Sequence, residues 1–329
     1  MSFKIERFIH LLIICLLCWQ IIFSHNLFAQ TNNQENLDEI RKKGFSYLQA
    51  GNWESAEKLF ENAIRIAPED SLSLYGNSLA LFNLNRHQES LISIEKAIEI
   101  LTKGKENKLL LADCLVLSAV ISGVQNENLA AISKLEKAIL LVPNHFDANF
   151  TLGRAYFGSG EIDKSVSAFK QAAVIRPKDA RTRFFLATAL ERAENTAEAL
   201  IEYQKVLELS PNSAEGNLGL GVLLIKTEGD KSEKGLAALQ KAVSLNPNMY
   251  EAQITLGKTL IKLNRASEAI QQLQKAAELA PNNPEPHFQL AIAYRKLGKK
   301  AEAEAENAIV KSIHESRRTV KTQNPPEEK

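Results

Sequence analysis

The chain has 329 residues, of which 45% are hydrophobic, and its 40 basic and 39 acidic side chains leave a formal net charge of +1. This balance gives no reason to expect a nucleic acid or another polyanion as partner. A chain of this length usually forms two domains, but an array of repeating units grows by addition and need not divide.

The N-terminal segment has the layout of a secretory signal. Lys4 and Arg7 precede an apolar run over residues 8–23, and a polar stretch with Ala29 follows. We therefore predict a signal peptide over residues 1–29, because the run is short of the ~20 residues that span a bilayer. Leu27 stands where a small residue is expected before the cleavage site, which leaves residues 8–23 as an uncleaved anchor for the alternative.

A polar spacer is predicted over residues 30–36, and a periodic pattern of proline follows it. Pro143, Pro177 and Pro211 are 34 residues apart, Pro247 follows after 36 residues and Pro281 after 34. Pro68 lies 75 residues before Pro143, which leaves room for one unit without its proline. A fixed period of this size predicts stacked supersecondary units instead of one globular core.

Each period carries two apolar stretches of helical spacing, and each stretch has one position that is always small. In the first stretch these residues are Gly44, Ser78, Ala119, Gly153, Ala187, Gly221, Gly257 and Ala291. In the second they are Ala56, Ser90, Ala131, Ser165, Ala199, Gly235, Ala269 and Ala303. Small residues on facing helices let two backbones approach closely. Residues that tolerate a left-handed turn lie between the stretches: Gly51, Asn85, Asn126, Gly160, Asn264 and Gly298.

These residues resemble the tetratricopeptide repeat (TPR) family, as the first unit shows with Gly44, Tyr47, Gly51, Trp53, Ala56, Phe60, Ala63 and Pro68. The resemblance covers residues 37–314 and implies an all-α fold: an α-solenoid of about eight stacked helix-turn-helix repeats in a right-handed superhelix. The repeats are expected over residues 37–70, 71–104, 112–145, 146–179, 180–213, 214–249, 250–283 and 284–314.

Departures from the pattern mark the irregular places. Thr102 replaces a proline, and extra residues over 105–111 predict an extended helix or a longer loop. Residues 227–235 lengthen one turn, and the polar stretch 299–318 fits an end cap. We predict a disordered basic tail over residues 315–329. Asn follows Pro143, Pro211, Pro247 and Pro281, which predicts that this Asn caps the next first helix.

The sequence contains no recognisable catalytic, cofactor-binding or metal-binding motif. The histidines after the export segment are far apart and are predicted to be exposed or at an interface, and Cys114 is predicted to be a buried small hydrophobe. An enzyme whose reactive groups converge from distant units, with Cys114 and His287 as its residues, is the remote alternative.

The family resemblance implies a concave groove lined by the first helix of each unit. Its predicted partner-binding residues are Tyr75, Leu79, Phe82, Val116, Val120, Phe150, Arg154, Phe157, Phe184, Arg192, Val222, Ile225, Lys226, Ile254, Lys258, Lys262, Phe288, Ile292 and Arg295. A long apolar stripe of this kind usually marks an interaction surface.

The sequence therefore predicts a non-enzymatic scaffold that binds an apolar or amphipathic segment of a partner protein, as a helix or as an extended chain. The protein is expected to be exported, and thus periplasmic or secreted, with no nucleic acid partner. The alternative is an assembly factor of an envelope complex that the uncleaved residues 8–23 anchor to a membrane. The oligomeric state stays open.

Overall fold

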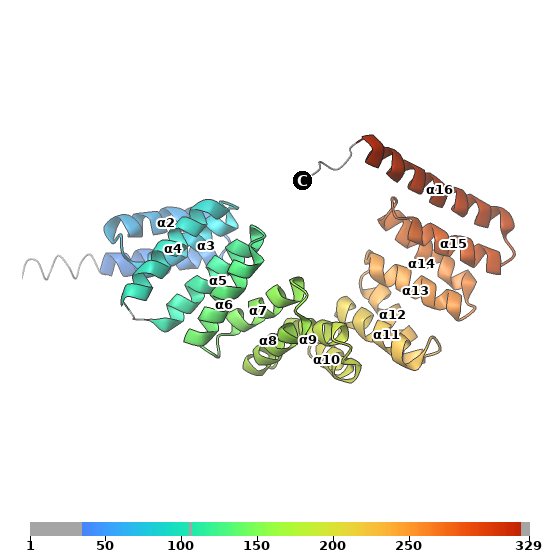
Figure 1. Cartoon of the computed structure of the whole chain (residues 1–329), viewed down its shortest axis with the longest axis horizontal. Helices are drawn as coiled ribbons and strands as arrows, with labels where there is room; N and C mark the ends of the chain where they lie inside the picture. The colour runs from blue at the N-terminus through green and yellow to red at the C-terminus, as the bar shows by residue number, and fades with distance from the viewer. Residues whose placement is uncertain (1–34, 105–106, 324–329) are drawn as a thin grey trace, which may run out of the picture. The chain divides into compact units, whose positions relative to one another are not determined.

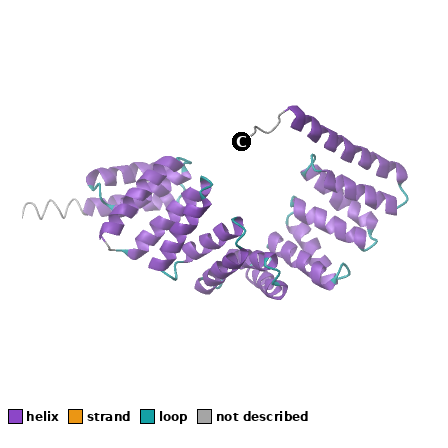
Figure 2. Ribbon diagram, viewed as in Figure 1, coloured by secondary structure: helices purple, strands orange, loops and turns teal. Residues whose placement is uncertain are grey.

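The computed structural model describes residues 35–104 and 107–323, with side chains through residue 318. The predicted signal, most of the spacer and the last residues lie outside this range. The described residues form helices and no strand, which confirms the predicted all-α fold of stacked helical hairpins (Figures 1 and 2). No helix in the described part combines the length and the apolar character that a membrane span requires.

The chain divides into two compact units between Ser159 and Gly160. The first unit begins with a helix over residues 35–49, and the helices that follow it are α2 (Trp53–Ile66), α3 (Ser71–Asn83), α4 (His87–Gly104), α5 (Lys108–Val124), α6 (Asn128–Leu141) and α7 (Phe146–Gly158). The second unit holds α8 (Ile162–Ile175), α9 (Ala180–Arg192), α10 (Thr196–Leu209), α11 (Ala214–Glu228), α12 (Glu233–Leu245), α13 (Tyr250–Lys262), α14 (Ala266–Leu279), α15 (Pro284–Lys296) and α16 (Lys300–Gln323).

Inside the hairpins of each compact unit, the two columns of small residues meet, as the sequence predicts. Ser78 and Ser90 are both fully buried, and their Oγ atoms lie 2.8 Å apart between α3 and α4. A Cβ added to Gly221 would lie 3.1 Å from the backbone oxygen of Gly235. The large apolar residues that follow the second column are also buried, among them Phe60, Ile94, Leu135, Phe169, Leu239 and Leu273. Close approach of the backbones therefore forms the core of these hairpins.

The turns inside the hairpins use the left-handed conformation at the predicted residues. The backbone angle φ is between 60° and 81° at Gly51, Asn85, Asn126, Gly160, Asn264 and Gly298. Glu194 adopts the same conformation with a φ of 59°, although its side chain disfavours it. In the lengthened turn, Gly229 has a φ of 87° and Ser232 caps α12 by accepting a hydrogen bond from the Gly235 N–H.

The predicted caps of the first helices are one residue too early. The N-cap residues are Asp70, His145, Asp179, Ser213, Met249 and Asn283, each two residues after the proline. The reason is a turn after the second helix, in which the His145 N–H donates to the Val142 oxygen at 3.0 Å. Asn144, Asn212, Asn248 and Asn282 fall within these turns and do not cap.

Two irregular regions resolve into longer helices. The helix α4 continues to Gly104, and residues 108–111 of the extra segment form the first turn of α5, whereas residues 105 and 106 lie outside the described residues. The predicted disordered tail begins too early, because α16 continues through residues 315–323 to Gln323. A pair between Lys311 and Glu315 four residues apart, at 3.8 Å, supports this continuation. Residues 324–329 lie outside the described residues.

Candidate functional site

The first helices of successive hairpins contact one another in both units. In the N-terminal unit α3 contacts α5 and α5 contacts α7, and in the C-terminal unit α9 contacts α11 and α13 contacts α15. Their outward-facing side chains form what we call the first-helix surface: α3, α5 and α7 in one unit, and α9, α11, α13 and α15 in the other. All the predicted partner-binding residues lie on these helices.

The apolar members of the predicted groove are packed more deeply than an open stripe would be. Phe150 is only 6% exposed and Ile254 is also buried, so both belong to the packed interior. The half-buried members are Tyr75, Leu79, Phe82, Val116, Val120, Phe157, Phe184, Val222, Ile225 and Ile292. Phe288 on α15 stands out with an exposed fraction of 44%. The cationic members, Arg154, Arg192, Lys226, Lys258, Lys262 and Arg295, are all exposed.

In the C-terminal unit, acidic residues from elsewhere in the stack neutralise part of this positive charge. Lys258 Nζ lies 3.1 Å from Glu285 Oε1, and Lys262 Nζ lies 3.0 Å from Asp230 Oδ1. Partial burial alone would raise the pKa of the Glu285 carboxyl, but hydrogen bonds from Lys258 and Gln289 outweigh it and lower that pKa. Arg295 donates through Nε to its own helix, at the Ala291 oxygen.

A polar cluster on the first-helix surface of the N-terminal unit was not predicted from the sequence. His145 is buried where α7 meets α5, and its Nδ1 accepts a hydrogen bond from the Ala148 N–H at 3.1 Å and so caps α7. Its Nε2 therefore carries the proton and donates to Asp113 Oδ1 at 2.9 Å. Beside them, burial and the charge of Asp113 raise the pKa of the Tyr75 hydroxyl. His145 lies two residues after Pro143, and this spacing is the signal in the sequence that could have predicted the cap.

One cavity of the C-terminal unit reaches the predicted groove. It has a volume of about 580 Å³ and lies where α9, the end of α10 and the start of α11 meet. Phe184 lines it together with Arg181, Val206 and Glu215. Volumes of 300–1,000 Å³ are typical of ligand pockets. Phe184 is therefore a predicted residue that lies at a concave feature of the described surface.

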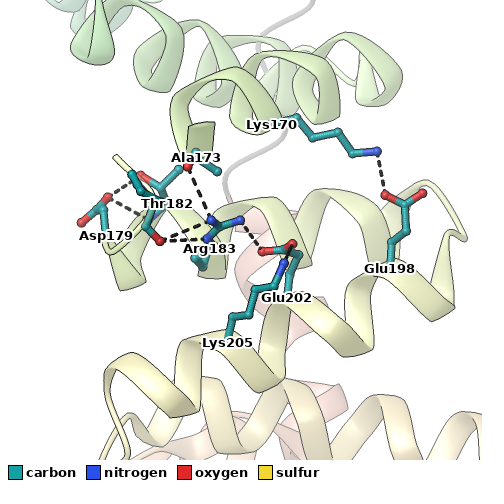
Figure 3. A network of polar contacts seen from close by, with 9 residues as sticks. Lys170, Ala173, Asp179, Thr182, Arg183, Glu198, Glu202 and Lys205 are labelled. Atoms are coloured by element: carbon teal, nitrogen blue, oxygen red, sulfur yellow. Dashed lines mark hydrogen bonds and ion pairs between the residues drawn. The ribbon is translucent and has the colours of Figure 1, made fainter. Parts of the chain in front are cut away.

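A network of polar contacts fixes α9, the helix that carries Phe184 (Figure 3). Arg183 Nη1 donates to Glu202 Oε2 on α10 at 3.0 Å, and both side chains are largely buried. Arg183 Nη2 also donates to the Pro177 oxygen at 3.3 Å, and Lys205 donates to Glu202 Oε1 at 2.8 Å. At the surface, Lys170 pairs with Glu198 at 2.6 Å. The buried pair ties α9 to α10 and to the preceding turn.

His287 and Cys114, the two residues of the enzyme alternative, each occupy an environment typical of a structural residue. His287 Nδ1 lies 2.6 Å from Glu306 Oε2, a contact between α15 and α16. Cys114 is fully buried, and burial together with the charge of Asp113 raises the pKa of its thiol to about 12. Among the described residues no group of three or more His, Cys, Asp or Glu side chains could hold a metal ion.

Cys114 should resist alkylation while the protein is folded. With a pKa of about 12 and no exposed surface, its thiol is almost entirely protonated at pH 8. Treatment with N-ethylmaleimide followed by peptide mass mapping should leave Cys114 unmodified, whereas the same treatment in guanidinium chloride should modify it completely. Rapid modification in the folded protein would contradict this burial.

Comparison with known proteins agrees with the helical-hairpin architecture and defines its class as repeat scaffolds for protein–protein interaction. Tetratricopeptide repeat models match residues 42–104, 124–180, 150–214 and 230–275, and a TPR repeat model matches residues 257–298. The chain belongs to the tetratricopeptide repeat family.

The curated relatives are much longer proteins. Anaphase-promoting complex subunit 3 of Schizosaccharomyces pombe is 22% identical over 176 residues, which cover 53% of this chain and 25% of that protein. The peroxisomal targeting signal receptor of Candida albicans is 26% identical over 174 residues, which cover 50% of this chain and 28% of the receptor. The chain thus spans about a quarter of the length of these relatives.

Solved structures share the fold. The C-terminal part of a TPR repeat-containing protein from Cytophaga hutchinsonii superposes with a TM-score of 0.59 at 15% identity and covers 76% of this chain and 99% of its own. PilF from Pseudomonas aeruginosa gives a TM-score of 0.58 at 18% identity and covers 68% of this chain and 97% of its own. YrrB, described as a TPR protein with an unusual peptide-binding site, gives 0.50 at 22% identity and covers 59% and 95%.

Proposed function

We propose that this protein is an exported, non-enzymatic TPR scaffold that binds an apolar or amphipathic segment of a partner protein on its first-helix surface. The observation that carries the proposal is the set of partly exposed apolar side chains on the first helices, with Phe288 the most exposed. Exposed aromatic side chains are common energetic anchors of protein interfaces.

The relatives are consistent with a protein segment as ligand. One is named as a receptor for a peroxisomal targeting signal, and the YrrB structure is described by its peptide-binding site. For this chain, the cavity beside Phe184 and the exposed Phe288 ring supply apolar contact area in the C-terminal unit. The carboxylates paired with Lys258 and Lys262 lower the positive charge beside the apolar side chains of α13, which favours an apolar or amphipathic segment over a strongly acidic one.

Export is proposed from Lys4, Arg7 and the apolar run over residues 8–23. Leu27 before the expected cleavage site favours the second candidate, an assembly factor that residues 8–23 anchor to a membrane. Mass spectrometry of the N-terminus of the protein from its native host separates the two. A mature chain that starts near Gln30 supports a released scaffold, and an intact N-terminus supports the anchored form.

Charged substitutions on the first-helix surface should weaken partner binding without unfolding the protein. Phe288→Asp is suited to this test because its ring is already 44% exposed, whereas Phe150→Asp would place a charge in the core. We expect Phe288→Asp and Phe184→Asp each to weaken binding of a partner captured from envelope extract by at least about tenfold. Pull-down with quantitative mass spectrometry measures the loss.

Ile201→Asp is the matched control, because Ile201 is 50% exposed on α10, a second helix. It should leave the captured partner bound, and circular dichroism should show all three variants to be folded. Binding that survives in Phe288→Asp and Phe184→Asp but disappears in Ile201→Asp would move the interface to the second helices.

A further inference from the structure

The turn that joins α15 to α16 carries a dense group of cations, which we call the basic turn: Arg295, Lys296, Lys299 and Lys300. These four cations lie within six consecutive residues, and that stretch contains no acidic residue. Every residue from 295 to 300 is exposed, including Leu297, whose exposed fraction is 40%. The basic turn is therefore a strongly charged patch with one apolar side chain at its centre.

The basic turn faces open space and has a fixed backbone. Gly298 has a φ of 77°, and a Cβ added to it would have no atom within 4 Å. The Leu297 N–H donates to the Ala293 oxygen at 3.2 Å, and the Lys299 N–H donates to the Tyr294 oxygen at 2.9 Å. A tip of this kind can contact a broad surface without any rearrangement of the fold.

Helix stability does not explain the two lysines at the start of α16. Lys299 directly precedes α16 and Lys300 is its first residue. The N-terminus of a helix carries a partial positive charge, so that a cation there is unfavourable. The other second helices begin with a residue other than lysine or arginine: Trp53, His87, Asn128, Ile162, Thr196, Glu233 and Ala266. The fold therefore does not require a lysine at this position.

The cations at the end of α15 are also not a general feature of helix ends in this unit. The last turns of the second helices α8, α10, α12 and α14 contain no basic residue, although a cation would be favourable at each of them. The last turns of α9, α11 and α13 contain one each, and that of α15 contains two, Arg295 and Lys296. Interaction with the helix dipole alone would not favour one set of helices over the other.

The contacts of Lys296 and Lys299 leave most of their positive charge uncompensated. Lys296 Nζ contacts two neutral acceptors, the Ile261 oxygen at 3.1 Å and Asn264 Oδ1 at 2.9 Å. Lys299 Nζ lies 4.0 Å from Glu302 Oε1, and both side chains are about half exposed, so this ion pair is weak. Like charges held this close repel one another, and an anionic partner would relieve that repulsion.

We infer that the basic turn binds the surface of a membrane that contains anionic phospholipids. Such a surface attracts clustered lysine and arginine side chains within about a Debye length, so cations at an exposed tip are well placed to reach it. Leu297, between the two pairs of cations, supplies an apolar side chain that can enter the headgroup region. An acidic protein segment would pair with the cations but would not need the exposed leucine. This contact goes beyond the proposed function, because it requires no partner protein.

Charge reversal at the start of α16 tests the inference. Lys299→Glu combined with Lys300→Glu should fold, because carboxylates are favourable at a helix N-terminus. In co-sedimentation of the full chain with vesicles of phosphatidylcholine and about one third phosphatidylglycerol, this variant should bind at least about tenfold more weakly than the unmodified protein. Vesicles of phosphatidylcholine alone measure binding that does not depend on anionic lipid, including any contribution of residues 8–23, and there the two proteins should be equal.

Lys42→Glu combined with Lys43→Glu is the matched control, since these are also adjacent exposed lysines and the change in net charge is the same. It should lower the affinity for the anionic vesicles by less than about twofold, because general electrostatic attraction at this distance from the surface is screened. Equal losses of affinity in the two double variants, or no loss in either, would overturn the inference.

Hydrogen exchange followed by mass spectrometry locates the contact. Amides of residues 295–300 should exchange severalfold more slowly on the anionic vesicles than without them, and Leu297→Ser should reduce this protection. Exchange that stays unchanged at these residues would overturn the inference. Protection by a soluble oligoglutamate peptide, with none by the vesicles, would also overturn it and would assign the basic turn to an acidic protein.

Discussion

Phe60→Ala should destabilise the N-terminal unit by about 3–5 kcal/mol. The Phe60 ring is fully buried and fills the space that two glycines leave open. A Cβ at Gly44 would lie 2.7 Å from its Cζ, and a Cβ at Gly76 would lie 2.4 Å from its ring. The edge of Phe45 contacts the same ring, with centroids 5.0 Å apart. Removal of the ring therefore leaves a cavity that alanine cannot fill and that joins two hairpins.

Hydrogen exchange followed by mass spectrometry measures this effect locally, because the stability of a repeat array is a sum over neighbours and a single global value can miss it. Exchange should accelerate in α2 and α3 and stay unchanged in the C-terminal unit. The variant Phe60→Leu keeps most of the apolar volume and should therefore lose less stability than Phe60→Ala. A loss below about 1 kcal/mol for Phe60→Ala would show that the hairpins collapse onto the vacant space.

Glu202→Ala should destabilise the C-terminal unit by about 3 kcal/mol, because it leaves the largely buried Arg183 guanidinium without its carboxylate. Replacing both Arg183 and Glu202 by methionine should restore most of that stability, since a well-packed apolar pair often equals a buried ion pair. Urea denaturation of the single and double variants measures the coupling between the two positions.

The control for this cycle is Glu198→Ala. Glu198 pairs with Lys170 at the surface, where both side chains are about half exposed, so its loss should cost less than about 1 kcal/mol. If Glu198→Ala and Glu202→Ala were equally destabilising, burial of the Arg183–Glu202 pair would not be the source of its effect.

The sequence predicted those parts of the fold that depend on contacts within one hairpin. The small columns pair residues about a dozen positions apart, and the turn residues act through their own backbone angle. Both features repeat with the period of the sequence, so they can be recognised without knowing how the hairpins stack. The N-caps were placed one residue early because the turn after each proline takes one residue more than the Asn pattern suggests.

The details of the candidate sites depend on contacts that the period does not encode. Glu285 belongs to the hairpin that follows that of Lys258, and the two side chains form an ion pair. Asp230, in the lengthened turn, pairs with Lys262. The depth of Phe150 and Ile254 depends on how neighbouring first helices pack against them.

The pairing of Lys258 with Glu285 and of Lys262 with Asp230 has a kinetic consequence. Long-range attraction of a charged partner requires a net field, and adjacent opposite charges cancel theirs within a few ångströms. These two lysines should therefore add little to the long-range attraction of an acidic molecule, so that replacing them would change its association rate, and the dependence of that rate on ionic strength, only slightly.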